Sequence, residues 1–271
     1  MKSISIYLSY IILFLFNLSL NSEELSIITW NIRNLGNCKL IGKDCTKNKK
    51  DIIKDIHFEI SKVFKNQDLI FIQELSTNSS VDNNAINSFV KTISSNMKWF
   101  VSKNVGNSSG NRERLLVIYN PEKLTYEYHS YIDKNCIIRS PLIIKFKELP
   151  IYFITTHITA KKELIISELS CIERNIGYNS FVLLGDTNAD CNYYPRTKVD
   201  ISNMVFKNSN WLILTGEDTT ISSKTNCTYD RIIGSKNIQF NDYSVYKNFK
   251  GDERFQLRIS DHYPINFRIE Y

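Results

Sequence analysis

The chain has 271 residues, of which 42% are hydrophobic and 23% are charged. This composition is typical of a globular protein and excludes a low-complexity or repeat protein. With 34 basic and 28 acidic residues, the net charge of +6 suits a polyanionic partner such as nucleic acid, although most proteins of similar charge bind none. No linker divides the chain after its N-terminus, and we expect one large domain over residues 23–271.

Residues 1–22, MKSISIYLSYIILFLFNLSLNS, predict a signal peptide. Lys2 precedes an apolar stretch that ends near Leu20, and small or polar residues follow around Ser22. The alternative is an uncleaved membrane anchor, because the stretch approaches the roughly 20 residues that span a bilayer. Polar residues interrupt it and no basic residue directly follows it, which favours cleavage. We therefore expect a secreted protein with no stable membrane association after the signal is removed.

Seven apolar runs that are rich in Ile and Val, with turn residues at their ends, predict strands. In chain order they cover residues 25–30, 69–73, 115–119, 142–146, 151–156, 181–184 and 263–269. Apolar residues at three- and four-residue spacing predict helices over 52–64 and 164–176. Strands that alternate with helices, together with strands that directly follow one another, predict an α/β protein with two packed mixed sheets.

Polar residues follow four of the apolar runs, and two more precede the last strand. They are Asn31 in ITWNIR, Glu74 in IFIQEL, His157 in FITTH, Asp186 and Asn188 in LLGDTN, and Asp261 and His262 in ISDHYP. Taken singly, each is more often a solvated loop residue or a hydrogen-bonded partner than a functional group. Together they predict one site at the edge of the sheets, where α/β folds bind ligands.

Two of the four histidines, His157 and His262, lie at these strand ends. Imidazoles titrate near neutral pH, so a pair of them can act as the base and the acid of a hydrolysis. Acidic residues that can orient them or bind a hard cation are also present, at Glu74, Glu113, Asp186, Asp230 and Asp261. Carboxylate and amide oxygens without a thiolate favour magnesium, manganese or calcium over zinc.

All six cysteines follow the leader, and an even count in an exported chain favours disulfides. No pair has the C-x-x-C spacing of a zinc ribbon or a redox site. Only Cys38 and Cys45 are suggested as a pair by their proximity in the sequence.

The order of WNIRNLG, QEL, RERLLVIY, TTH, GDTNADC, TNCTYDRI and SDHYP resembles the deoxyribonuclease I family of the endonuclease/exonuclease/phosphatase superfamily. The resemblance covers essentially the whole mature chain, and NADC together with TNCTYDRI is its most specific part. It implies a four-layered α/β sandwich, with two packed mixed sheets flanked by helices. It also implies a magnesium- or manganese-dependent endonuclease that hydrolyses DNA with little sequence specificity to 5′-phosphate and 3′-hydroxyl ends.

The resemblance also implies roles for individual residues. His157 and His262 match the catalytic histidines, with Glu113 orienting the first and Asp230 the second; which one is the acid stays open. The metal- and phosphate-handling positions are matched by Asn31, Glu74, Asp186, Asn188 and Asp261. Arg139 and Tyr229 match contacts to the substrate phosphate, although Arg139 taken alone is more typical of a solvated cation at a strand edge. Cys191 and Cys227 match the structural disulfide of the family, which leaves Cys136 and Cys171 as a further pair.

The chain departs from the family pattern at positions that contact DNA. Ser76 stands where the family has an arginine that enters the minor groove, and Asn111 stands where a tyrosine stacks on the sugar backbone. Both changes put duplex affinity in doubt without touching the chemistry. Asp218, Thr220 and Thr225 match a structural calcium site, but one extra residue lies between Asp218 and Cys227.

Two alternatives stay open. A phosphoesterase of the same fold would act on phospholipids or phosphoinositides, or would be the nuclease subunit of a toxin, but the NADC and TNC cysteines argue against both. A catalytically silent module would bind DNA or a protein, but the His, Asp and Glu residues of the expected site are all present. We expect the protein to be a monomer.

Overall fold

The structure is a computed structural model. It describes residues 23–271 with the exception of 47–49, 51, 78–80 and 107–111. The expected signal peptide and Asn111 therefore lie outside the described residues. Within the described ranges, no helix is both long enough and apolar enough to cross a membrane.

The core of the fold is a pair of six-stranded mixed sheets. The first sheet has the order β11-β12-β1-β2-β4-β3 and contains β1 (Glu24–Leu35), β2 (Leu69–Leu75), β3 (Lys98–Val101), β4 (Arg114–Tyr119), β11 (Phe240–Val245) and β12 (Ile265–Glu270). The second has the order β5-β6-β7-β8-β10-β9 and contains β5 (Tyr126–Tyr131), β6 (Leu142–Phe146), β7 (Tyr152–His157), β8 (Phe181–Asp186), β9 (Ser209–Trp211) and β10 (Asp230–Ser235). Strand β1 is parallel to β2, and β7 is parallel to β8.

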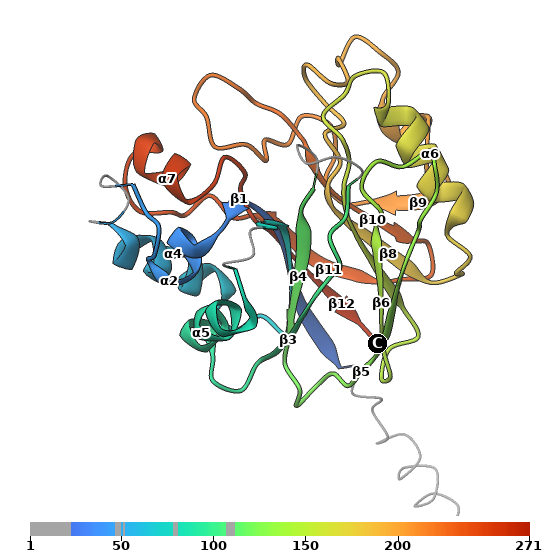
Figure 1. Cartoon of the computed structure of the whole chain (residues 1–271). Helices are drawn as coiled ribbons and strands as arrows, with labels where there is room; N and C mark the ends of the chain where they lie inside the picture. The colour runs from blue at the N-terminus through green and yellow to red at the C-terminus, as the bar shows by residue number, and fades with distance from the viewer. Residues whose placement is uncertain (1–22, 47–49, 51, 78–80, 107–111) are drawn as a thin grey trace, which may run out of the picture.

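Helices cover the outer faces of both sheets (Figure 1). The first sheet packs against α2 (Asn37–Ile41), α4 (Ile53–Phe64), α5 (Asn83–Ile93) and α7 (Glu253–Ile259). The second packs against α6 (Ile165–Asn175), and a short 3-10 helix η2 (Ile201–Asn203) lies in the same apolar cluster. The predicted α/β sandwich, with two packed mixed sheets between helices, is confirmed.

Apolar side chains pack on both faces of the central strands. This packing explains why the sequence shows apolar runs at these strands. Ile27 and Phe71 of the first sheet share one buried cluster with Phe153 and Leu184 of the second, and the rings of Phe71 and Phe153 lie 5.7 Å apart. The alternate residues Ile28 and Ile70 pack against helices on the other face. Because these central strands are buried on both faces, they appear in the sequence as continuous apolar runs rather than as an alternating pattern.

A buried glutamine joins the sheets directly beneath the strand ends. Gln73 is fully buried, and its Nε2 donates hydrogen bonds to Thr29 Oγ1 at 3.1 Å and to Thr155 Oγ1 at 3.0 Å. The two threonines belong to β1 and β7, one in each sheet. This polar contact therefore fixes the relative position of the sheets close to the residues that the sequence analysis singled out.

The seven predicted strands and both predicted helices are present, and several elements were not predicted. Strands β3, β5, β9 and β11 lie at the sheet edges, and helices α2 and α7 are short, whereas α5 is as long as α6, with 11 residues each. The sequence of β5, YEYHSY, is half-exposed and carries no apolar run. The start of α5 had a readable signal, because the Asp82 side chain accepts a hydrogen bond from Ala85 N at 2.8 Å.

We predict that Gly185→Ala destabilises the protein by at least about 2 kcal/mol. Gly185 has φ +124°, and an added Cβ would lie 2.2 Å from the carbonyl oxygen of Thr156 on the neighbouring strand. Chemical denaturation measures the change in the free energy of unfolding. Gly177→Ala is the matched control, because its Cβ would meet nothing within 4 Å, and it should change stability by less than about 0.5 kcal/mol. Equal stability of the two variants would contradict the prediction.

Candidate active site

The carboxylate of Asp186 is the centre of the candidate site. The residue is 2% exposed, and its Oδ2 accepts a hydrogen bond from Asn31 Nδ2 at 3.1 Å. The same oxygen lies 3.4 Å from His157 Nε2 and 3.7 Å from His262 Nε2. The other oxygen, Oδ1, accepts a hydrogen bond from Asn188 N at 2.9 Å. Both imidazoles therefore direct the same ring nitrogen toward one buried carboxylate.

The register of the second sheet brings these groups together. Strand β8 ends at Asp186, and its two neighbours place His157 of β7 and Asp230 of β10 directly opposite that residue. Adjacent strands lie about 4.8 Å apart, so side chains at paired positions on one face are within contact distance. The two sequence segments that end in His157 and Asp186 thus converge because β7 and β8 run parallel.

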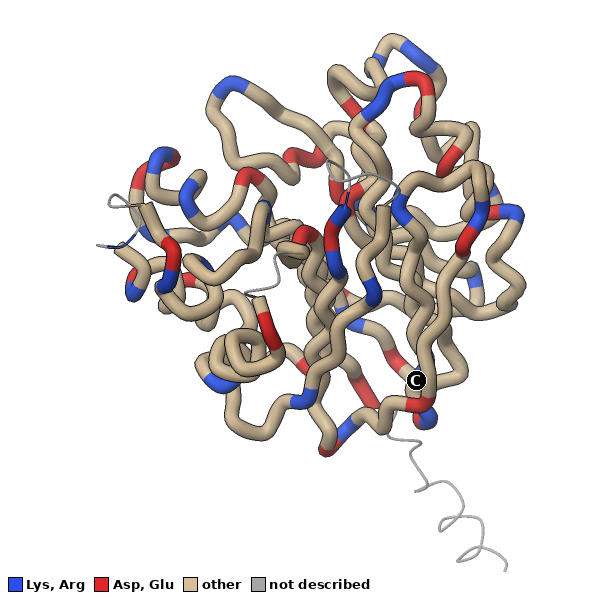
Figure 2. The backbone as a smooth tube through the Cα atoms, in the orientation of Figure 1, with Lys and Arg blue, Asp and Glu red and all other residues tan. Residues whose placement is uncertain are grey.

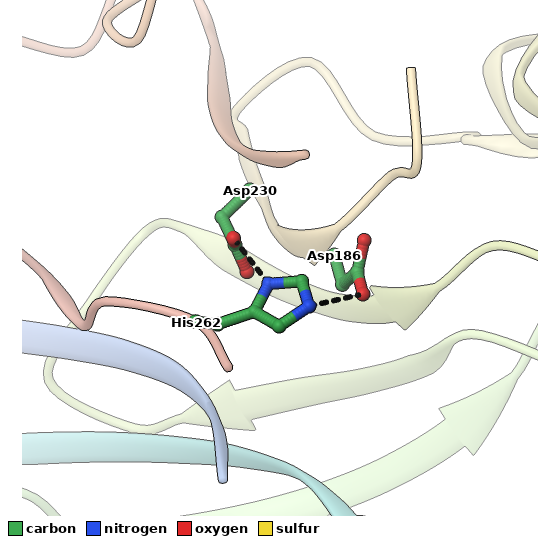
Figure 3. Close-up of side chains that lie close together, drawn as sticks. All are labelled: Asp186, Asp230 and His262. Carbon is green, nitrogen blue, oxygen red and sulfur yellow. Dashed lines mark hydrogen bonds and ion pairs between the residues drawn. The ribbon is translucent and has the colours of Figure 1, made fainter. Parts of the chain in front are cut away.

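Each imidazole is held by a carboxylate on its other nitrogen. His157 Nδ1 lies 2.7 Å from Glu113 Oε2, and His262 Nδ1 lies 2.7 Å from Asp230 Oδ2. Figure 3 shows the second pair, with the Nε2 side of His262 facing Asp186. Such a carboxylate fixes the orientation and the tautomer of the ring, and it stabilises the imidazolium form. The pairings that the sequence analysis predicted are present.

The segment that carries His262 is tied to the end of β1. Trp30 Nε1 donates a hydrogen bond to the carbonyl of His262 at 2.8 Å. Ser260 Oγ donates to the carbonyl of Asn31 at 2.6 Å and accepts from His262 N at 3.0 Å. The SDH segment between α7 and β12 therefore has little freedom relative to Asn31.

Glu74 extends the site beyond Asp186. Its Oε1 accepts a hydrogen bond from Asn31 Nδ2 at 3.0 Å, and its Oε2 accepts one from Asn34 N at 2.9 Å. The amide nitrogen of Asn31 thus bridges a carboxylate from each sheet. Glu74 has φ +63°, a left-handed conformation that side chains rarely adopt and that is concentrated at functional sites.

The electrostatics of the site are dominated by buried carboxylates. Burial alone would lower the pKa of His262, but Asp230 and Asp186 outweigh it and raise the pKa to about 10. Burial likewise opposes the charged form of His157, but Glu113 and Asp186 raise its pKa. Burial raises the pKa of Asp186 itself, because its buried negative charge is only partly compensated.

Glu74 differs from Asp186 in its preferred charge state. Burial opposes ionisation of Glu74, but the positive charge of His157 and the hydrogen bond from Asn31 outweigh it and lower the pKa. Glu74 is therefore ionised at neutral pH. The site as a whole attracts positive charge, and its oxygen donors are of the type that hard divalent cations prefer.

The structure brings together most of the residues expected to hold a metal. Asn31 joins Glu74 to Asp186. Asp186 also forms a group of potential ligand atoms within 4.8 Å of one another with Asp230 and His262, two residues that were expected to act in proton transfer instead. Asn188 Nδ2 donates to the carbonyl of Ile158 at 2.9 Å, which leaves its Oδ1 as the atom for a ligand. Asp261 lies at the rim, where its side chain is 40% exposed and lies 3.4 Å from Arg33 Nη1.

Arg139 and Tyr229 flank the two histidines. Arg139 Nη1 donates to the carbonyls of His157 and Ile158 at 3.5 and 3.4 Å, and its side chain is 13% exposed. Arg139 is therefore not a solvated cation at a strand edge. The ring of Tyr229 lies 6.1 Å from that of His262, and burial raises the pKa of Tyr229 to about 12, which keeps its hydroxyl protonated.

The three residues that match a calcium site also lie together. Asp218 Oδ1 accepts a hydrogen bond from Thr220 Oγ1 at 2.9 Å, and Thr220 Oγ1 lies 3.3 Å from Thr225 Oγ1. The extra residue before Cys227 does not separate them. Lys247 Nζ lies 3.8 Å from Asp218 Oδ2.

All six cysteines are paired, as Cys38–Cys45, Cys136–Cys171 and Cys191–Cys227. The last bond joins the loop after β8 to the segment before β10. It thus connects the two chain segments that deliver Asp186 and Asp230 to the site.

Two charged groups are buried behind the site, and the sequence analysis missed the second of them. Asp190 is 1% exposed and accepts hydrogen bonds from Arg196 Nη2 at 2.6 Å and from Thr228 N at 2.7 Å. Arg231 is fully buried and donates to the carbonyls of Ile213 at 2.8 Å and Ala189 at 3.2 Å. An arginine at the start of an apolar run gives no signal that it faces inward. Its hydrogen-bond acceptors lie in loops whose positions cannot be predicted from the sequence.

Comparisons with known proteins agree with this architecture. The model of the Endonuclease/Exonuclease/phosphatase family matches residues 28–262. Human deoxyribonuclease gamma is 25% identical over 95% of this chain and 90% of that protein, and bovine deoxyribonuclease-1 is 26% identical over 91% and 92%. A solved endonuclease/exonuclease/phosphatase family protein from Leptotrichia buccalis has a TM-score of 0.61 at 16% identity, over 91% of this chain and 100% of that chain.

The structural likeness shows the shared fold, and the match to the family model also includes the residues of the candidate site. This match begins in β1 before Asn31 and ends at His262. It therefore includes every residue that contacts Asp186 in the candidate site. The chain belongs to the endonuclease/exonuclease/phosphatase family.

Proposed function

We propose that the protein is a secreted, divalent-metal-dependent endonuclease that hydrolyses DNA with little sequence specificity to 5′-phosphate and 3′-hydroxyl ends. The observation that carries this proposal is the pair of carboxylate-held imidazoles whose Nε2 atoms both face Asp186. Similarity to deoxyribonuclease gamma and deoxyribonuclease-1 supports DNA as the substrate. The three disulfides support secretion, because structural disulfides persist in oxidising compartments.

The two imidazoles supply the proton transfers of a hydrolysis. One takes a proton from the attacking water, and the other, as imidazolium, donates a proton to the leaving 3′-oxygen as the P–O bond breaks. Glu113 holds His157 and Asp230 holds His262 in the orientation that each role requires. Arg139 and Tyr229 contact the phosphate in this arrangement.

Asn31, Glu74, Asp186, Asn188 and Asp261 would hold a magnesium or manganese ion. Their donors are carboxylate and amide oxygens, which hard divalent cations prefer. The ion, when bound, neutralises phosphate charge and stabilises an in-line displacement. We also propose that Asp218, Thr220 and Thr225 bind a structural calcium ion, which the grouping of their oxygens supports.

We predict that His157→Ala and His262→Ala each reduce nicking of plasmid DNA in magnesium by at least about 100-fold, because each removes a proton-transfer group. His129→Ala is the matched control, since His129 lies on β5 and contacts Phe100 and Tyr126 instead of the site. Thermal unfolding should show that all three variants fold. A chelator should abolish nicking by the unmodified protein.

Two results would overturn the proposal. Nicking by either site variant at the rate of the His129→Ala control would exclude the proposed mechanism. Release of phosphate from phosphoinositides without nicking of DNA would favour the alternative of a phospholipid-cleaving member of the family.

We predict that His262 is protonated at neutral pH in the metal-free protein, because Asp230 and Asp186 raise its pKa from 6.5 to about 10. The raised pKa contributes stability that is fully present below about pH 6.5. This contribution is lost as the pH rises toward about 10. Unfolding in chelator, measured across this range, should show the decline, and Asp230→Asn should flatten it. An NMR titration of His262 with a midpoint at or below its usual value would contradict the prediction.

A further inference from the structure

The loop between β7 and α6, residues 158–164, is anchored to the catalytic centre. Ile158 N donates to the carbonyl of Asp186 at 2.8 Å, and Thr159 N donates to Glu168 Oε2 at 3.4 Å. Further along the loop, Lys161 N donates to the carbonyl of Thr159 at 2.9 Å, and Leu164 N donates to that of Lys161 at 2.9 Å. The loop is therefore a series of turns in a defined position beside His157.

Two lysines project from this anchored loop into solvent. Lys161 and Lys162 are both exposed, and neither forms an ion pair with a carboxylate in the part of the chain that the structure describes. Figure 2 shows where basic (blue) and acidic (red) residues lie along the backbone, and in the sequence Glu163 directly follows the two lysines. Long cationic side chains without a protein partner are available to a polyanion.

The reach of these side chains matches the spacing of phosphates. Lys161 follows His157 by four residues, so their Cα atoms are at most about 14 Å apart. One DNA strand carries a phosphate about every 3.4 Å along the duplex axis. The ammonium groups can therefore reach phosphates only a few nucleotides from the one between His157 and His262.

The end of β2, on the side of the site formed by the first sheet, offers DNA no unengaged cation among Ser76 and its described neighbour Arg114. Ser76 follows Glu74 at the end of β2, and its short side chain carries no charge. The neighbouring Arg114 donates from Nε to the carbonyl of Ser76 at 3.0 Å and from Nη2 to that of Val81 at 3.0 Å. Its guanidinium is thus engaged in the local fold, so this end of β2 does not supply the cation that the family's minor-groove arginine would provide.

We propose that Lys161 and Lys162 form an auxiliary contact for the phosphodiester backbone of DNA, next to the scissile phosphate. This inference rests on the proposed function, and it assigns a DNA-binding surface to the side of the site formed by β7 and α6. Backbone contacts of this kind carry no sequence information, in keeping with a nuclease of little sequence specificity.

The test is the salt dependence of equilibrium binding to a fluorescein-labelled DNA duplex, measured by anisotropy in chelator so that no cleavage occurs. The plot of log K against log salt has a negative slope. The double variant Lys161→Gln/Lys162→Gln should make this slope less steep by about 1.8, since each lost contact with B-DNA contributes about 0.9. Glu163→Gln removes a negative charge from the same loop and should strengthen binding at low salt. Damage to the loop would weaken binding in both variants. Weaker binding by the lysine variant and stronger binding by Glu163→Gln would therefore exclude it as the cause.

Lys236→Gln is the matched control. Lys236 is exposed directly after β10, at the opposite end of that strand from Asp230, and its loss should leave the slope unchanged. An unchanged slope in the Lys161→Gln/Lys162→Gln protein, with an unchanged unfolding temperature, would overturn the inference even if the unmodified protein cuts DNA. A less steep slope without any DNA cleavage in magnesium would leave the surface in place and refute the proposed function.

Discussion

The interaction on which the site depends is the convergence of three side chains on Asp186 Oδ2. Asn31 donates to this oxygen, and the Nε2 atoms of His157 and His262 face it at 3.4 and 3.7 Å. Asn31 belongs to the first sheet and Asp186 to the second, so the site exists only when the sheets are packed together. The hydrogen bonds of the buried Gln73 and the apolar core between the sheets set that packing.

The same constraint applies to each imidazole and its carboxylate. Glu113 directly precedes β4 of the first sheet, whereas His157 ends β7 of the second. His262 precedes β12 of the first sheet, whereas Asp230 begins β10 of the second. The packing of the two sheets thus aligns both imidazole–carboxylate pairs. A shift between the sheets would disturb both pairs, while the exposed loops around the site can vary with less effect on the chemistry.

Much of this arrangement could be predicted from the sequence. Continuous apolar runs identified the central strands, and the polar residues at their ends identified His157, Asp186 and His262. The partnership of Glu113 with His157 came from the family resemblance, because it depends on the packing of two sheets. Gln73 gave no signal for a similar reason: its partners lie 44 and 82 residues away in the sequence. The edge strand β5 was missed because its sequence, YEYHSY, is half-exposed and contains no aliphatic run.

The most direct test of the central claim is single-turnover cleavage of DNA by Asp186→Asn in magnesium. The amide keeps the size of the side chain and removes the charge that faces both imidazoles. We expect cleavage to fall by at least about 100-fold, in a protein whose unfolding temperature changes by only a few degrees. Cleavage within about tenfold of the unmodified rate, by a folded variant, would show that the shared carboxylate is not what organises the chemistry.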